Sequence, residues 1–579
     1  MPTRAILRAF TAACLSLFLA ACAGDRVVAP RATIGVATGT GAAMDDAPDS
    51  ASVLWPSDAL WAGFGSAADD GAYALDALTA LPAEPDIRIG VVQSASAVVL
   101  GGTSNWVVRD RATGAWLGSG TPGQTATVTL ASVPETWIYF QVTCSGVAAV
   151  NTLKAQADGL GYYTLTELAP LGCTRLLIGR LPTSSTTAQR DAFKVTLRSQ
   201  GLSTGGEFAR TITIGNQVVY KVTRATGSAQ SVNPVIVTAA SGGYVTIGAA
   251  GGAQPAYRGR GEVRMNSAGT LAGINELPME QYLYGVLPRE LGPIQYPEVE
   301  AQKAQAVAAR TYAMAGRGKR NADGYDLRAT TDDQVYGGYS VEHPVSNAAV
   351  DATRGMVATY AGKLISTNFF STSGGHTADN DEAFTGAPVA YLRGVPDAER
   401  GASLEHVPSL AVFRAHANPK SLRNAAEGDF ESDWASYHRW SYEWSAEEIS
   451  AVISAYAGRP VGQVLEINVT SRGPSGRALS IEYVTEGGVV TDARKDGIRG
   501  SLRYINASGN PVNLPSTLFF VEPVKEQGKL TGGFRVYGGG FGHGVGLSQT
   551  GAVGMAQKGH RFDEILAHYY QGTALEAAY

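Results

Sequence analysis

Cysteine is scarce in this chain of 579 residues, which contains four. None of the four lies in a Cys-x-x-Cys motif or beside a histidine cluster, so a structural zinc site is not expected. Charged residues are also few, at 17%, and 46 Lys and Arg against 51 Asp and Glu leave a net charge of −5. Because Lys and Arg form no long run, the sequence argues against a nucleic-acid-binding protein. The glycine-rich stretch 538–546 fits neither G-x-G-x-x-G nor a P-loop, and we expect no nucleotide, metal or other cofactor.

Apolar residues, by contrast, make up 44% of the chain, which is enough for real cores and excludes disorder throughout. Glycine is abundant at 70 residues, and 25 Tyr, 16 Phe and 8 Trp accompany it, which indicates a turn-rich protein with many β-strands. At about 150 residues per domain, the length predicts three or four domains.

The N-terminus has the pattern of an export signal. Arg4 and Arg8 precede an apolar stretch, residues 9–21, that is too short to span a bilayer. The ending Leu-Ala-Ala-Cys22 resembles a bacterial lipobox, in which Cys22 becomes the lipidated first residue. Ala23, in place of Asp, resembles the pattern sent to the outer membrane. We therefore expect a lipoprotein anchored to the outer membrane and facing the periplasm; a general secretory signal with a chance cysteine is the alternative.

Changes in composition divide the rest of the chain. The boundaries we predict are a signal peptide at 1–21, a lipidated linker at 22–84, a β-rich domain at 86–134 plus 213–261, an insertion at 135–212 and a catalytic core at 262–579. The linker is rich in Ala, Gly, Asp and Ser, whereas the β-rich domain consists of short β-branched runs separated by glycine turns.

The insertion has the predicted order β-α-β-β-α-β. Its strands are expected at 137–143, 162–168, 173–181 and 207–214, and its helices at 147–159 and 186–201. The first and third strands of this topology are antiparallel neighbours, which brings Cys144 near Cys173 and predicts a disulfide. With Leu-Ile-Gly-Arg-Leu at 177–181 ahead of a helix, the stretch resembles the SPOR (sporulation-related repeat) domain, which implies binding to glycan strands stripped of stem peptides. A generic ferredoxin-like module is the alternative.

Four blocks in the C-terminal half carry the chemistry. They read PMEQYLYGVLPREL (278–291), EVEAQKAQAVAARTYA (298–313), FFSTSGGHTA (369–378) and GGGFGHGVGLSQTGAVGMAQKGHRFDEILAHYYQGT (538–573). Helices are predicted at 280–287, 298–315 and 563–570. The alternate glycines from 540 to 546 suggest an extended segment whose bare face meets a ligand or another backbone.

These blocks, in this order and spacing, resemble the SpoIID/LytB family (stage II sporulation protein D and its relatives). The resemblance implies a mixed α/β core within an α+β multidomain protein. It also implies a lytic transglycosylase that cleaves MurNAc–GlcNAc bonds of denuded glycan and leaves 1,6-anhydro-MurNAc ends. Glu290 matches the position of the family's catalytic acid. Ser373 and Phe384 stand where relatives often have Cys and Trp, which makes the metal site of some relatives doubtful here.

Besides Glu290, we predict a set of substrate-binding side chains. They are Lys303, Gln305, Arg310, Ser371, Thr372, Ser373, His376, His543, Ser548 and Gln549. Lys303 and Arg310 could instead form a solvated helix face, and Arg310 could pair with a carboxylate. His376 and His543 could form a two-histidine metal site, but no third ligand is placed. Trp434, Trp440 and Trp444 could stack on sugars or belong to a core.

A transglycosylase needs one acid, because the MurNAc 6-hydroxyl replaces the water that a hydrolase would activate with a second carboxylate. Glu290 must be protonated near neutral pH, so a partly buried apolar cleft is expected to raise its pKa. Leu287 and Leu291 fit that demand, whereas Arg289 opposes it unless it points away. The alternative function is a non-catalytic glycan-binding lipoprotein that stimulates or scaffolds a cell-wall amidase. The expected partners are denuded glycan strands, the membrane through the anchor, and an amidase or division proteins.

Overall fold

The structure is a computed structural model that describes residues 78, 80–169, 172–399, 411, 413–414, 430–431, 434–506 and 509–579. The signal peptide, Cys22 and nearly all of the predicted linker lie outside these residues. The described residues form two compact units, one of 440–472 and 478–538, the other of the remainder. Among the described residues, no helix has the length and apolar character needed to cross a bilayer. The fold is mixed α/β and multidomain, as the sequence predicts.

The β-rich domain contains most of one seven-stranded sheet, with strand order β15-β1-β14-β13-β10-β3-β4. The strands are β1 (Asp86–Ala95), β3 (Trp106–Asp110), β4 (Trp116–Gly120), β10 (Val235–Ala239), β13 (Arg260–Met265), β14 (Leu271–Pro278) and β15 (Leu327–Arg328). A second sheet includes β2 (Ala97–Gly102), β9 (Gly227–Ser231), β11 (Val245–Ala249) and β12 (Ala256–Tyr257). Their buried side chains form one core that also takes in Leu283, Val286 and Leu287. The β-rich domain therefore supports the helix that ends in Glu290.

The insertion shows the predicted order of elements. They are β5 (Thr125–Ser145), α1 (Val147–Gly159), β6 (Tyr163–Leu168), β7 (Thr174–Pro182), α2 (Thr187–Ser199) and β8 (Phe208–Arg224). β5 and β7 are antiparallel neighbours, and a disulfide joins Cys144 to Cys173, whose Cα atoms are 5.4 Å apart. A capping box at Thr186 begins α2, where the sequence places a helix start.

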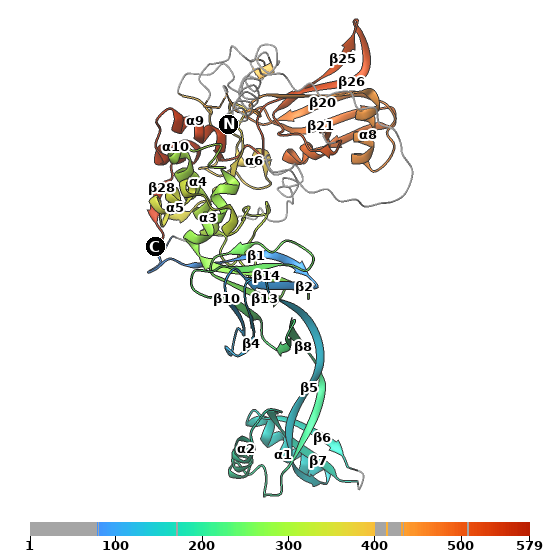
Figure 1. The fold of residues 1–579 in the computed structure, drawn as a ribbon. Helices are drawn as coiled ribbons and strands as arrows, with labels where there is room; N and C mark the ends of the chain where they lie inside the picture. Colours follow the sequence, from blue (N-terminus) through green and yellow to red (C-terminus); the bar gives the residue numbers. More distant parts are fainter. Residues whose placement is uncertain are drawn as a thin grey trace, which may run out of the picture. The chain divides into compact units, whose positions relative to one another are not determined.

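β5 differs from the prediction. The expected strand at 137–143 and the β-branched run at 126–130 of the β-rich domain form one continuous strand of 21 residues. It pairs with β8 from Thr127 opposite Thr223 to Gln141 opposite Phe208 (Figure 1). Pro134 lies inside β5. β2 pairs with β5 before this residue and β7 pairs with β5 after it, so the stretch around Pro134 pairs only with β8. One side of this stretch is a sheet edge, where the missing N–H of a proline breaks no ladder bond.

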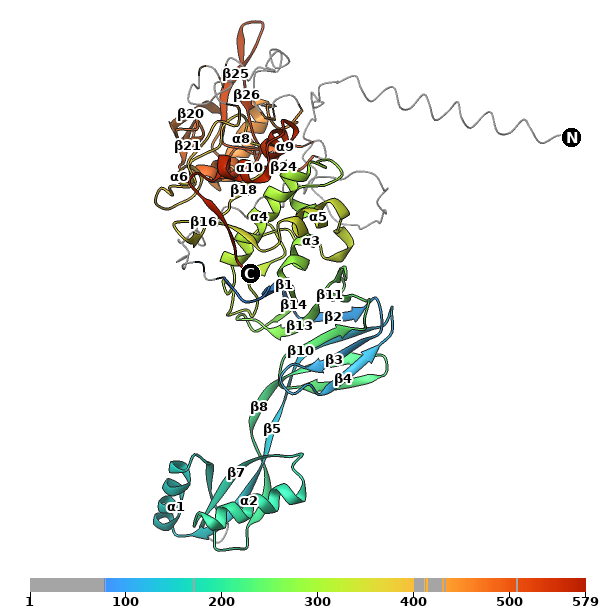
Figure 2. The same cartoon turned by 90° about the vertical axis from the view of Figure 1, so that its left-hand side faces the viewer.

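The core around Glu290 is helical. α3 (Met279–Glu290), α4 (Val299–Ala315) and α5 (Pro344–Ala352) lie side by side (Figures 1 and 2). The other elements are η2 (Tyr339–Val341), β16 (Met356–Tyr360), β17 (Lys363–Leu364), β18 (Phe369–Phe370), α6 (Asn380–Ala383), β27 (Leu547–Ser548), α9 (Gln549–Gln557), α10 (Phe562–Tyr569) and β28 (Ala574–Ala577). Ala301, Ala304 and Ala308 of α4 are fully buried, which lets the neighbouring backbones approach closely. Gly316 ends α4 as predicted.

The second unit is built from small antiparallel sheets and one helix. Its elements are β19 (Trp440–Trp444), α8 (Ala446–Ala457), β20 (Val464–Arg472), β21 (Ala478–Thr485), β22 (Gly488–Asp492), η4 (Lys495–Gly500), β23 (Tyr504–Ile505), β24 (Pro511–Val512), β25 (Phe519–Glu526) and β26 (Lys529–Gly538). Trp440 and Trp444 are buried, and the indole of Trp444 donates to the Arg503 carbonyl at 2.8 Å. Trp440 and Trp444 therefore belong to a hydrophobic core, which is one of the two alternatives that the sequence left open, the other being stacking on sugars.

Candidate active site

Glu290 is the last residue of α3 and retains 9% of its surface. Its Oε1 accepts a hydrogen bond from the Val335 amide at 2.9 Å, and among the described residues no second group donates to this carboxyl. Burial therefore raises the pKa of Glu290 to about 7, and the Val335 amide, which acts in the opposite direction, offsets only part of the effect. A carboxyl with this pKa exchanges a proton readily at neutral pH.

A loop that the sequence analysis passed over, residues 329–338, holds the Val335 amide in place. The Tyr282 hydroxyl donates to Gln334 Oε1 at 3.0 Å, and the Gly337 amide donates to the Gly285 carbonyl at 3.0 Å. Gly285 permits this approach, because a Cβ there would lie 2.5 Å from the Tyr336 ring. The pair Gly337-Gly338 beside a polar run was the available signal for the loop.

Asp333 lies two residues before Val335 and is the obvious second carboxylate on this loop. It is buried and bound to Lys319 at 3.0 Å and Arg320 at 3.3 Å. Its oxygens also accept from the Tyr312 hydroxyl at 3.1 Å and the Arg328 amide at 2.9 Å. Asp333 thus anchors the loop. Its charge is not among the causes of the raised pKa of Glu290, which are burial and the opposing Val335 amide.

Two predicted residues, Gln549 and Gln305, lie at Glu290. Gln549 Nε2 donates to the main-chain carbonyl of Glu290 at 2.9 Å and lies 3.5 Å from Gln305 Oε1. Both side chains are buried. Gln302, one turn earlier on α4, donates to the Leu291 carbonyl at 2.8 Å and the Tyr296 carbonyl at 3.1 Å. These amides fix the backbone carbonyls of Glu290 and of the residues that follow it, so they position Glu290.

The predicted cluster of hydroxyls surrounds a carboxylate that the sequence analysis missed, Glu431. Thr550 and Ser548 donate to Glu431 Oε2 at 2.6 and 3.2 Å. Ser373 donates to Glu431 Oε1 at 3.0 Å, as does the Gly374 amide at 2.7 Å. Burial raises the pKa of Glu431, but hydrogen bonds from His438, Thr550 and Gly374 outweigh it and hold the pKa at about 2. Nothing in the local sequence marks Glu431, whose hydroxyl partners lie more than 50 residues away in the chain.

The hydroxyl residues are therefore corrected from substrate binding to internal support. Ser371, Thr372, Ser373 and Ser548 retain 3%, 2%, 0% and 0% of their surface. The Ser371 carbonyl accepts from the Thr550 amide, and the single hydroxyl proton of Ser373 is shared between Glu431 and Asp397, whose Oδ2 lies 2.6 Å away. The segment 548–550 thus bonds to Glu431 through its outer residues and to Glu290 through the middle one.

The two histidines are buried too, since His376 retains 8% and His543 2% of its surface. His376 Nδ1 lies 2.6 Å from the Thr377 carbonyl. His543 Nδ1 accepts from the Val545 amide at 3.0 Å, and its ring packs against Phe370 and Phe384. These contacts favour an internal role for both histidines, and their substrate-binding role stays a prediction. Among the described residues, no group of three metal-ligating side chains occurs.

Two of the alternate glycines, Gly540 and Gly546, meet another backbone, which is one of the two expected options, whereas Gly542 and Gly544 face the side chains of Phe370 and Arg477. Gly540, Gly542, Gly544 and Gly546 have φ values of 84°, 109°, 88° and 78°, so the segment is not simply extended. A Cβ at Gly540 would lie 2.8 Å from the Ser373 carbonyl, and one at Gly546 would lie 2.1 Å from the Asn368 carbonyl. Glycine is required there because of both its conformation and its size.

Arg310 and Lys303 do not form the predicted pair of sugar-binding cations. Arg310 is fully buried and binds Glu280 through Nε at 2.9 Å and Nη2 at 2.6 Å. Its remaining donors reach the carbonyls of Met356 at 3.1 Å and Val350 at 3.2 Å. Arg310 is therefore corrected to a structural ion pair, the alternative that the sequence left open. Lys303 pairs with Glu300 at 2.7 Å, at the other end of α4.

Comparison with known proteins agrees with the resemblance of the motifs. Residues 267–360, which include Glu290 and the Val335 loop, match the family described as stage II sporulation protein (SpoIID). An uncharacterised protein of Brachyspira hyodysenteriae is 34% identical over 306 residues, which cover 52% of this chain and 68% of that protein. The chain belongs to the SpoIID/LytB family. Residues 378–546 match a domain family of unknown function.

Two further relatives have names. The amidase enhancer of Bacillus subtilis is 30% identical over 313 residues, 51% of this chain and 40% of the enhancer. The stage II sporulation protein D of Bacillus amyloliquefaciens is 26% identical over 320 residues, 53% of this chain and 76% of that protein. The chain thus spans less than half of the amidase enhancer but most of the sporulation protein.

Proposed function

We propose that this protein is a peptidoglycan lytic transglycosylase that cleaves MurNAc–GlcNAc bonds in denuded glycan strands. The observation that carries the proposal is Glu290, a buried carboxyl with a pKa of about 7 at the position of the family's catalytic acid. An ordinary glutamate would be ionised at neutral pH and could not donate a proton to a leaving oxygen. Membership of a family that includes lytic transglycosylases supports the same reaction.

The reaction needs one proton carrier. Glu290 gives its proton to the bridging oxygen as the bond from that oxygen to MurNAc C1 breaks. The MurNAc 6-hydroxyl attacks C1, and its proton passes to the Glu290 carboxylate. The products are a strand with a free GlcNAc 4-hydroxyl and a strand with a 1,6-anhydro-MurNAc end. Atoms balance without water, and Glu290 returns to its protonated form.

The surroundings of Glu290 favour this route over hydrolysis. A glycosidase that uses water generally pairs two carboxyl groups about 5 to 9.5 Å apart. A second carboxylate at that distance would raise the pKa of Glu290 through charge repulsion. Among the described residues, the causes of the shift are burial and the opposing Val335 amide. Asp333, the carboxylate on the adjacent loop, is neutralised by Lys319 and Arg320.

The test of the proposal is Glu290→Gln, which keeps the shape of the side chain and removes the proton. Binding to amidase-treated glycan strands should persist, while turnover should fall by orders of magnitude. Glu447→Gln, on the first turn of α8, is the matched control and should turn over normally. Undiminished cleavage by Glu290→Gln would remove Glu290 from the mechanism.

A second candidate is a glycan-binding lipoprotein that stimulates or scaffolds a cell-wall amidase without cleaving glycan itself. The relative named amidase enhancer favours it. The two functions separate in an assay of amidase activity on intact sacculi. A stimulating role predicts that Glu290→Gln raises amidase turnover as much as the wild type does.

We also propose that Cys22 carries the lipid, that the protein faces the periplasm from the outer membrane, and that residues 135–212 bind denuded glycan. The signal sequence supports the first two statements. For the third, the insertion presents Arg180 against the rings of Trp137 at 4.4 Å and Tyr163 at 4.9 Å. Tyr163 is 60% exposed, which suits stacking on a sugar.

A further inference from the structure

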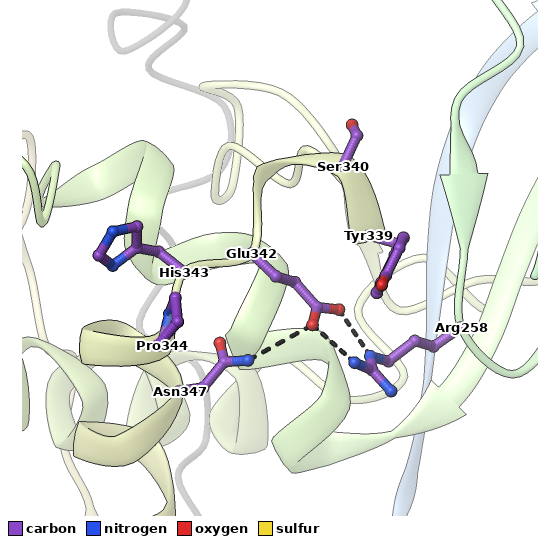
Figure 3. A pocket seen from close by; sticks show the side chains of 7 residues that line it. All are labelled: Arg258, Tyr339, Ser340, Glu342, His343, Pro344 and Asn347. Carbon is purple, nitrogen blue, oxygen red and sulfur yellow. Dashed lines mark hydrogen bonds and ion pairs between the residues drawn. The ribbon is translucent and has the colours of Figure 1, made fainter.

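A pocket lies beside α3, in the larger unit, where the turn between β12 and β13 meets the stretch 339–347. Its lining residues are Arg258, Tyr339, Ser340, Glu342, His343, Pro344 and Asn347. Arg258 comes from the turn before β13, Tyr339 from η2, and Asn347 from the first turns of α5. Figure 3 shows Glu342 between Arg258 and Asn347, with Tyr339 beside the guanidinium. None of these residues has a role in the proposed cleavage.

Tyr339 provides the pocket with a rigid aromatic surface. Its ring stacks on Tyr244 with centroids 3.6 Å apart, and the guanidinium of Arg258 lies 5.3 Å from its centroid. A hydrogen bond with the Tyr339 hydroxyl is the main cause that raises the pKa of Tyr244. Although it is held on these sides, Tyr339 is 37% exposed. An aromatic ring fixed in this way binds a ligand with little loss of side-chain entropy.

The charges of the pocket cancel. Arg258 binds Glu342 through Nε at 2.6 Å and Nη2 at 2.7 Å, and Asn347 Nδ2 lies 3.4 Å from Glu342 Oε2. A bidentate pair of this kind leaves no net charge to attract an anion or a cation. His343 Nδ1 accepts from the Val345 amide at 3.3 Å, which places the proton of the neutral imidazole on Nε2. The lining thus offers a ring face, hydroxyls and an N–H, which suit a neutral polyhydroxylated ligand.

The pocket is connected to the acid by a short, fixed piece of chain. Tyr339 follows Val335, the residue that donates to Glu290, by four positions, so the two lie within about 14 Å of each other. Between them, the Gly337 amide is bound to the Gly285 carbonyl on α3 at 3.0 Å. A ligand that extends from Glu290 over a few sugar rings could therefore reach Tyr339.

We infer that this pocket is a distal subsite that binds one sugar ring of the glycan strand through stacking on Tyr339. The inference rests on the proposed function, since it assumes that the strand passes Glu290. The sugar lies against the open part of the Tyr339 ring, and its hydroxyl or acetamido groups meet Ser340 and His343. The subsite adds affinity for strands long enough to span both places and leaves the chemistry at Glu290 unchanged.

The test measures binding separately from cleavage, in the full-length Glu290→Gln protein with amidase-treated glycan strands as the probe. Tyr339→Ala and Tyr339→Leu should each weaken the Kd about tenfold, because both remove the ring face, whereas Tyr339→Phe should keep most of the affinity. Tyr360→Ala is the matched control, since Tyr360 is also 37% exposed and also packs on a second tyrosine, Tyr391.

An unchanged Kd for Tyr339→Leu, or an equal loss for Tyr360→Ala, would overturn the subsite. Thermal melts of every variant identify any loss that comes from unfolding, and Tyr339→Leu keeps the volume of the side chain if Tyr339→Ala does not fold. Turnover by the protein with Glu290 intact is measured in parallel. If the protein with Glu290 intact shows no turnover but the Tyr339 variants bind glycan weakly, the proposed cleavage is wrong and the sugar-binding subsite is still supported.

Discussion

Two buried glutamates in the same region have opposite acidities, and hydrogen bonding decides the difference. The pKa of Glu431 lies at about 2, because hydroxyls, an amide and His438 all donate to it. The pKa of Glu290 lies at about 7, because burial raises it and one amide opposes it. Burial alone therefore does not create an acid; a proton donor also needs a carboxyl that the protein leaves nearly without donors.

The raised pKa of Glu290 predicts a pH-dependent cost in stability. The folded protein holds this proton more tightly than the unfolded chain, whose pKa is 4.5. Below pH 4.5 the carboxyl is protonated in both states and does not affect the free energy of unfolding. As the pH rises from 4.5 to about 7, the free energy of unfolding falls by about 3 kcal/mol. Glu290→Gln does not titrate, so it should gain stability over the wild type between pH 5 and 8. Denaturant unfolding at both pH values measures this, and an equal difference at both would mean that the pKa is not raised.

Arg310 should matter for folding and not for glycan binding. Because Glu280 and Arg310 form a buried pair, Arg310→Ala leaves a buried carboxylate without its partner and should cost about 3 to 5 kcal/mol. Lys303→Ala, on the same helix, removes a partly exposed pair and should cost less than about 1 kcal/mol. Thermal unfolding gives both values. A folded Arg310→Ala protein of normal stability that fails to bind glycan would restore Arg310 to the site.

At the scale of elements, the sequence predicted the helix and strand boundaries that depend on nearby residues. The helix at 147–159, the start at Thr186 and the stop at Gly316 follow from hydrophobic spacing, capping and glycine, and each is confirmed. The merger of two expected strands into β5 was not predictable, because it depends on pairing with β8, about 80 residues later in the chain.

The candidate site shows the same division. Glu290 lies in a motif and could be named from sequence, together with Gln549, which bonds to its carbonyl. The hydroxyls of the Ser371–Ser373 block looked equally functional, but they donate to or support Glu431, and no pattern connects that glutamate with them. Polar clusters of this kind have the same composition whether they face a ligand or a buried carboxylate.

The disulfide should stabilise the insertion. It closes a loop with a sequence separation of 29 residues, which loop-closure entropy values at roughly 3 to 4 kcal/mol. Replacing both Cys144 and Cys173 with Ser should make residues 135–212 more sensitive to proteolysis, while the rest of the chain resists as before. Alkylation under denaturing, non-reducing conditions should find no free thiol at these positions in protein from the periplasm; two labelled thiols would contradict the pairing.

At the scale of the whole molecule, the N-terminal cysteine should determine where the protein resides. Cys22→Ala should leave it uncleaved or soluble, since the lipid is the proposed anchor. Fractionation of cells that express each form measures this, and Ser16→Ala, inside the apolar stretch, is the control that should remain with the membrane. If Cys22→Ala fractionates with the outer membrane like the wild type, the lipid anchor is wrong.

The central claim is that Glu290 acts alone and that water takes no part in the cleavage. Mass spectrometry of products from purified denuded strands, with the reaction run in oxygen-18 water, tests both statements together. We expect 1,6-anhydro-MurNAc ends, each lighter by one water than a reducing end, with no oxygen-18 incorporated, and no such products from Glu290→Gln. Reducing ends that carry oxygen-18 would show hydrolysis and contradict the account.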